Sequence, residues 1–104
     1  MKLKWSRQAL LSIQHNALYI QDMFGARARI KFFSDISHIA KLLKDNSYLG
    51  RIEPLLDEAS VAYRSITVNK LNKIIYYVND DTIEIVDFWD TRMDPLQLSN
   101  RVSS

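Results

Sequence analysis

Three runs of β-branched and aromatic residues, separated by very short polar segments, constrain the fold of this chain most strongly. The runs are VAYRSITV at 61–68, KIIYYV at 73–78 and TIEIVDFW at 82–89. Residues of these types favour strands. The intervening NKLN and NDD contain Asn and Asp, which adopt turn geometry readily. Because connections this short join only antiparallel neighbours, this half of the chain is predicted to form an antiparallel meander.

The first half of the chain carries helical patterns instead. Residues 2–5 alternate polar and apolar side chains and predict one short strand, after which Ser6 is suited to cap a helix. Two helices are predicted, over 7–24 and about 26–45, with Gly25 between them forcing an antiparallel hairpin. The expected inward side chains of the two helices are Leu10, Ile13, Ala17, Ile20, Phe24, Ile30, Phe33, Ile36, Ala40 and Leu43.

The order of these elements predicts an α+β domain of the type β-αα-βββ. We expect the N-terminal strand and helical hairpin to pack on an antiparallel sheet, one face of which is buried and the other free. A chain of 104 residues supports one domain, so 1–104 is interpreted as a single unit. Residues 46–60 are predicted to form a connecting loop with room for a short edge strand, and 96–104 a flexible tail.

Composition narrows the class of protein further. The chain is 47% apolar and 25% charged, as expected for a domain with a packed core, and it contains no cysteine. It has no apolar run near the roughly 20 residues that span a bilayer. The N-terminal MKLKWSRQ lacks the apolar segment of a signal peptide. These features predict a cytoplasmic protein without disulfides or a membrane span.

Charge is distributed unevenly along the chain. Residues 1–51 contain nine Lys or Arg against three Asp, a balance of +6, whereas 52–104 contain five against nine acidic residues, a balance of −4. A basic half favours an acidic partner, either nucleic acid or an acidic protein segment. A solvated helix surface is the equally simple alternative.

Recognised catalytic, metal-binding and cofactor-binding motifs are absent, so we expect no cofactor or metal. His15 and His38 lie on predicted helices and are interpreted as surface or interface histidines. Arg64 and Lys73 lie in predicted strands, where they either form cross-strand ion pairs or present cations to a phosphate. The sequence DFWDTRMDP places Arg92 among aspartates at the end of the last strand, where either a salt bridge or a functional cation is expected.

Four segments in this order resemble the RelE/ParE superfamily of bacterial type II toxin–antitoxin systems. They are LKWSRQALLSI, LKDNSYLGRI, AYRSITVNKLNKIIYYV and IEIVDFWDTRMDP, and together they cover about residues 2–98. The resemblance implies a toxin that is neutralised by a cognate antitoxin in a hetero-oligomer. Members of this superfamily act in two ways: ParE-like toxins poison DNA gyrase, and RelE-like toxins are metal-independent endoribonucleases that cut mRNA on the ribosome.

The resemblance also assigns roles to the strand cations. In a RelE-like nuclease, Lys73 and Arg92 would clamp the scissile phosphate, and Arg64 would be a third catalytic candidate. This chain departs from the nuclease pattern because it lacks the preceding lysine cluster, has Leu98 where a tyrosine is expected, and flanks Arg92 with Asp90 and Asp94. We therefore predict a toxin that acts by protein binding in the gyrase-inhibiting, ParE-like manner, with the nuclease as the alternative.

Overall fold

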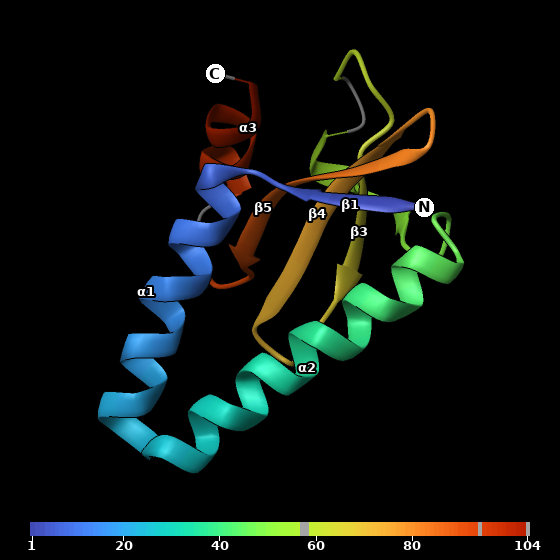
Figure 1. Cartoon of the computed structure of the whole chain (residues 1–104). Helices are drawn as coiled ribbons and strands as arrows, with labels where there is room; N and C mark the ends of the chain where they lie inside the picture. The colour runs from blue at the N-terminus through green and yellow to red at the C-terminus, as the bar shows by residue number, and fades with distance from the viewer. Residues whose placement is uncertain (57–58, 94, 104) are drawn as a thin grey trace.

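The computed structural model describes residues 1–56, 59–93 and 95–103. The elements in chain order are β1 (Lys2–Trp5), α1 (Arg7–Phe24), α2 (Ala26–Asp45), β2 (Arg51–Ile52), the short 3₁₀ helix η1 (Pro54–Leu56), β3 (Arg64–Thr67), β4 (Asn72–Asn79), β5 (Thr82–Asp90) and α3 (Pro95–Ser103). Figure 1 shows the two long helices on one side of a twisted sheet. The predicted β-αα-βββ order is therefore present, β2 is the short edge strand expected within 46–60, and η1 and α3 are added.

The sheet has the strand order β1-β5-β4-β3-β2. Strands β3, β4 and β5 form the predicted antiparallel meander, in which Asp80 takes the positive φ of 55° that the last turn needs. Strand β1 pairs with β5 in parallel, so the sheet is mixed and not wholly antiparallel as predicted. The reason is the helical hairpin, which is long enough to carry the chain back to either end of the sheet before the meander begins.

One irregularity in β5 determines which of its side chains face each layer. Ile75 pairs with Asp87 and Tyr76 pairs with Ile85, so Val86 is an extra residue between the two pairs. Such a bulge shifts the alternation of the bulged strand by one residue. As a result, Ile85 and Phe88 both contribute to the core beneath the helices, although they are three residues apart.

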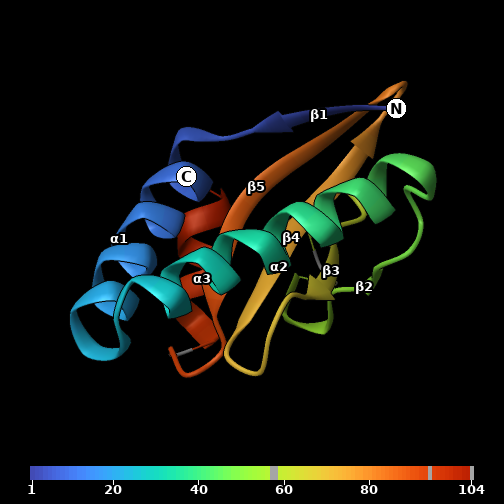
Figure 2. The same cartoon turned by 60° about the horizontal axis from the view of Figure 1, so that its bottom comes forward.

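Helix α1 begins where the sequence predicts. The Ser6 hydroxyl accepts a hydrogen bond from the Ala9 amide at 3.0 Å and donates one to the Val86 carbonyl at 2.8 Å, so one side chain caps α1 and ties it to β5. Gly25, with φ of 91°, ends α1 and starts α2. From this junction the two helices diverge, as the two views in Figures 1 and 2 show.

The predicted inward positions of the two helices are confirmed for Ile13, Ala17, Ile36 and Leu43 and wrong for four others. Ala9, Ile13, Ala17, Phe32, Ile36 and Leu43 are buried. Leu10, Phe24, Ile30 and Phe33 are exposed by 48%, 68%, 68% and 37%, so the prediction that they face inward is wrong. Ala9 and Ala17 let α1 approach the sheet closely because their side chains are small, and this close approach turns the larger Leu10 toward solvent.

The second face of the sheet is covered by η1 and α3. Leu56, Ile75, Trp89 and Leu98 form a small core there, separate from the core beneath the long helices. The sequence predicts a free sheet face and a flexible tail over 96–104, whereas the structure has helix α3 over 95–103. The difference arises because Leu98 is fully buried and Arg101 forms an ion pair with Asp87, and neither contact has a local sequence signature.

No helix in the described part of the chain is long and apolar enough to cross a membrane.

Candidate functional site

The three cations singled out by the sequence lie on three different parts of the sheet. Lys73 is opposite Trp89 in the β4–β5 pairing, so its side chain faces the layer formed by η1 and α3. Arg64 is opposite Tyr76, a residue of the core beneath the long helices, and therefore belongs to the other face. Arg92 follows the end of β5 and lies beside α1.

Lys73 forms a largely buried ion pair. Its Nζ lies 2.7 Å from Oε2 of Glu53, and the two side chains are 13% and 1% exposed. Glu53 follows the two-residue strand β2, whose pairing with β3 brings it toward β4. This ammonium is thus directed inward, toward a carboxylate of the same chain.

The surroundings of Glu53 favour its charged form. Burial of the carboxyl raises its pKa, but hydrogen bonds from Lys73, Ser65 and the Leu55 amide outweigh burial, so the pKa of Glu53 lies below its usual value. At neutral pH the pair is therefore ionic, a cation held by an anion inside the protein.

The Arg64 side chain also contacts residues of its own chain. Its Nη1 donates to the Gly50 carbonyl at 2.8 Å, and its guanidinium carbon lies 4.8 Å from the centre of the Tyr48 ring. The Gly50 amide donates to the hydroxyl of the fully buried Tyr76 at 2.8 Å. A side chain at position 50 would place its Cβ 2.7 Å from both the Ser65 carbonyl oxygen and that hydroxyl, which explains why the predicted connector contains glycine here.

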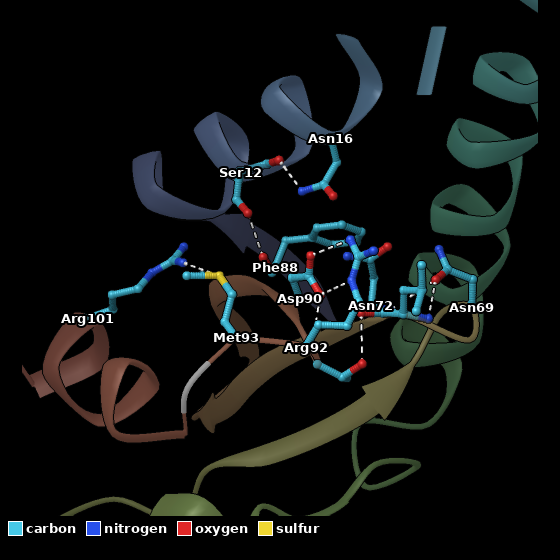
Figure 3. Close-up of polar contacts among 11 residues, drawn as sticks. Ser12, Asn16, Asn69, Asn72, Phe88, Asp90, Arg92, Met93 and Arg101 are labelled. Carbon is cyan, nitrogen blue, oxygen red and sulfur yellow. Dashed lines mark hydrogen bonds and ion pairs between the residues drawn. The ribbon is translucent and has the colours of Figure 1, made fainter. Parts of the chain in front are cut away.

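Arg92 is held by the carboxylate of Asp90. Figure 3 shows the guanidinium across Asp90, with Nη2 2.8 Å from Oδ2 and Nε 3.1 Å from Oδ1, while the Arg92 amide also donates to Oδ1 at 2.9 Å. The hydrogen bonds from Arg92 lower the pKa of Asp90 and raise that of Arg92. The Arg92 side chain is nevertheless 58% exposed, so this is the most accessible of the three cations. Asp94, the other aspartate that flanks Arg92, is outside the described residues.

A shallow hollow of about 190 Å³ adjoins Arg92 and Asp90. His15, Asn16 and Tyr19 of α1 complete its lining. His15 is exposed, in agreement with its interpretation as a surface histidine, and so is His38. The proximity of His15 and Tyr19 to Arg92 depends on the packing of α1 against β5, and no motif in the sequence indicates it.

The structure therefore does not gather Lys73, Arg64 and Arg92 into one site. Each cation contacts an acceptor of its own chain, and Lys73 and Arg64 point to opposite faces of the sheet. Among the described residues, no group of three His, Asp or Glu side chains could hold a metal ion.

The sequence offered an ion pair as one alternative for Lys73 but did not identify Glu53 as its partner, and it missed the pair Arg101–Asp87. One signal was available, because Asp87 lies between Val86 and Phe88 in an otherwise apolar strand, and a carboxylate in such a position requires a partner. The identity of that partner, 14 residues further along the chain, could not be read from the pattern.

Comparison with protein families shows to which family the chain belongs. Residues 3–95 match the family model of the ParE toxin of the type II toxin–antitoxin system parDE. The chain belongs to the ParE toxin family. The predicted resemblance is thus confirmed, and the chain is a toxin of a type II toxin–antitoxin system. Comparison with curated proteins gives no match.

Solved structures confirm the fold of this ParE toxin. A protein of the chromosomal ParDE toxin–antitoxin system from P. aeruginosa is 22% identical, with a TM-score of 0.72 over 88% of this chain and 97% of that one. YoeB of Staphylococcus aureus, described as a dimer, is 23% identical, with a TM-score of 0.58 over 85% and 93% of the two chains. The same toxin in a heterotetrameric YoeB–YefM complex has a TM-score of 0.55. The RelE/ParE-like α+β fold is therefore shown.

Proposed function

We propose that this ParE toxin acts by binding protein, with DNA gyrase as its target, and that a cognate antitoxin neutralises it. Membership of the ParE family supports this mode of action. The observation that carries the choice is the ion pair between Lys73 and Glu53, because a phosphate clamp would need the ammonium that Glu53 holds inside the protein. Both gyrase and the antitoxin would be met in the cytoplasm.

The antitoxin is proposed to form a hetero-oligomer with this toxin. The S. aureus toxin YoeB, which shares the fold, was crystallised with YefM in a heterotetramer. Exposed apolar side chains on α1 and α2 and the positive charge of the first half of this chain suit an amphipathic, acidic segment. We expect the gene for the antitoxin to lie beside the gene for this toxin.

The alternative function is a ribosome-dependent, metal-independent mRNA endoribonuclease. One observation favours it, namely the hollow in which the exposed Arg92 lies beside His15 and Tyr19. An imidazole can transfer a proton and a guanidinium can bind a phosphate, so this site has some of the chemistry that RNA cleavage requires. In this alternative Arg92, Lys73 and Arg64 are the catalytic candidates.

Two reactions with the purified toxin distinguish these functions. In the first, DNA gyrase is incubated with plasmid and toxin, and we expect covalent gyrase–DNA complexes to accumulate. In the second, a translation reaction is supplied with a defined message, and we expect the message to stay intact.

The variant Arg92→Gln is compared with the wild type in both reactions. Because Arg92 is exposed and its described hydrogen bonds all go to Asp90, its loss should leave the fold unchanged. Message that is cleaved by the wild type and spared by Arg92→Gln, without trapped gyrase, would overturn the proposal in favour of the nuclease.

A further inference from the structure

Strand β4 extends beyond the end of its neighbour β3. The pairing of the two strands ends at Arg64 and Tyr76, whereas β4 continues to Asn79, as Figure 2 shows. The chain before β3 lies away from β4 because the Tyr63 amide donates to the Val61 carbonyl at 3.1 Å, which is the hydrogen bond of a γ-turn. The last residues of β4 therefore form an open edge of the sheet.

The backbone of Val78 faces this open edge. The Asn72 carbonyl accepts from the Val68 amide at 2.9 Å, so Asn72 directs its backbone groups toward β3. Every second residue of an antiparallel strand faces the same neighbour, which places Tyr76 and then Val78 on this side of β4. Because β3 ends opposite Tyr76, the N–H and C=O of Val78 have no strand partner in the described part of the chain.

A pocket of about 350 Å³ lies where β3 would otherwise continue. Its lining comes from the γ-turn before β3, from the end of β4 and from Tyr48, which follows α2. This volume is within the range of pockets that bind ligands. Arg64 is the one described residue of the lining that is charged at neutral pH, so the pocket carries a positive charge.

The guanidinium of Arg64 has no carboxylate partner. Its printed contacts are the Gly50 carbonyl, 2.8 Å from Nη1, and the ring of Tyr48, and the ion pairs among the described residues do not include it. A guanidinium has five N–H donors, so one carbonyl leaves donors for another acceptor. A partly buried cation of this kind favours an anion as its further ligand.

Arg64 and the open edge are related by the geometry of the sheet. A residue that paired with Val78 would take the position two residues before Arg64 in the register of β3. Side chains two residues apart in a strand lie on the same face. A carboxylate on the residue opposite Val78 would therefore lie on the same face as Arg64 and close to it.

We propose that the open edge of β4 and Arg64 together bind an extended, acidic segment of a partner protein. One residue of that segment exchanges two backbone hydrogen bonds with Val78, and its side-chain carboxylate pairs with Arg64. Asp80 and Asp81 follow β4 but do not line the pocket, so they disfavour further acidic residues of the segment beyond Asn79. The inference goes beyond the proposed function, which places partner contacts on the helices.

A peptide fits this edge better than a nucleic acid does. Each peptide unit offers a donor and an acceptor, and Val78 presents one of each. Phosphate oxygens could accept from Arg64 and from the Val78 amide, but they offer no donor to the Val78 carbonyl. The pairing of donor with acceptor therefore selects a protein segment added to the sheet.

A short synthetic peptide tests the site. It alternates Thr and Val around one central Glu and is blocked at both ends, so that it carries a single carboxylate. Added to the isotope-labelled toxin, it should shift the NMR signal of the Val78 amide until the site is saturated. Replacing the Glu by Gln, or methylating its backbone nitrogen, should weaken binding about tenfold, because each change removes one of the proposed contacts.

A matched pair of toxin variants assigns the preference for Glu to Arg64. Arg64→Gln removes the charge and keeps an amide that can donate to the Gly50 carbonyl, whereas Arg51→Gln makes the same change at an exposed arginine that does not line the pocket. We expect Arg64→Gln to bind the Glu and Gln peptides equally and Arg51→Gln to keep the preference. If Arg64→Gln does not fold, the modified peptides with the wild-type toxin decide the question.

Four results would overturn the inference. The peptide could leave the Val78 signal unshifted, or the Glu and Gln peptides could bind the wild type equally. The Val78 signal could shift with toxin concentration alone, which would assign the edge to a second copy of this chain. A short RNA could displace the peptide, which would assign the edge to nucleic acid. The titration contains neither gyrase nor antitoxin, so its failure is separate from a failure of the proposed function.

Discussion

At the scale of single residues, the ammonium of Lys73 and the carboxylate of Glu53 lie 2.7 Å apart with little access to water. Removing two charges from water is costly, and their attraction compensates only while both are present. If one partner were removed, the remaining charge would still be kept from water but would no longer be attracted by an opposite charge. The pair therefore matters more to stability than an exposed pair of the same length.

We expect Glu53→Gln to lower the free energy of unfolding by about 3 kcal/mol, because it leaves the Lys73 ammonium without its anion. Urea unfolding followed by tryptophan fluorescence measures the change. Asp35→Asn is the matched control, since it breaks an exposed pair with Lys31 and should cost less than about 1 kcal/mol. Stability equal to that of the wild type would mean that the Lys73–Glu53 pair adds no net stability, which would weaken the argument against the nuclease alternative.

At the scale of elements, the C-terminal helix α3 is attached to the sheet by few contacts. Leu98 is buried against Trp89 and Ile75, and Arg101 Nη2 lies 2.7 Å from Oδ1 of the fully buried Asp87. Burial raises the pKa of Asp87, and the charge of Arg101 opposes this without cancelling it. The charged form of Asp87 is tolerated because α3 brings Arg101 to it.

We expect Arg101→Met to loosen α3 in a pH-dependent way. Without the cation, the hydrogen bond from the Phe88 amide still opposes burial, but the folded-state pKa of Asp87 rises further above the unfolded value. Stabilisation from the protonated form is therefore present at low pH and lost as pH rises through the folded pKa. The variant should be destabilised more at about pH 7 than at about pH 5.

Hydrogen exchange of the α3 amides, measured at both pH values, tests this expectation. Asp87→Asn combined with Arg101→Met serves as the control, because it has no carboxyl to titrate at position 87. If the single variant loses protection equally at both pH values, the titration of Asp87 is not what governs the docking of α3.

The sequence predicts the ends of a helix well where they are marked by a residue at the end itself. Ser6 and Gly25 mark the beginning and end of α1, and both are confirmed by the cap hydrogen bond and the positive φ. The orientation of the helices is predicted less well. Leu10 and Ala9 both fit an amphipathic pattern, and the choice between them is made by how closely α1 approaches the sheet.

At the scale of the whole molecule, lowered carboxyl pKa values make folding sensitive to acid. The pKa values of Glu53 and Asp90 lie below their ordinary values in the folded state. Each therefore contributes stability that is fully present above its unfolded-state pKa and is lost as pH falls through the folded pKa. The pKa of Asp87 is raised in the folded state, so its contribution to stability is present at low pH and is lost as pH rises through the folded pKa.

We expect the free energy of unfolding to decrease as the pH falls from about 5 to about 3, with the two lowered groups outweighing Asp87. Urea midpoints across this range measure the trend. Glu53→Gln should lose less stability over the same interval than the wild type, because it has no carboxyl to protonate. An equal loss in both proteins would assign the acid sensitivity to other groups.

Sequence patterns were sufficient for the antiparallel meander and the helical hairpin, since these depend on residues within a few positions of one another, and the order of four short segments was sufficient for the family. The parallel pairing of β1 with β5, the bulge at Val86 and the cover of the second sheet face by α3 arise from packing between distant segments. The same applies to the candidate site. Lys73 meets Glu53 from 20 residues away, and only the folded chain places Arg64 and Lys73 on opposite faces. A residue type fixes which charge is available, whereas the burial and the partner of that charge follow from long-range packing.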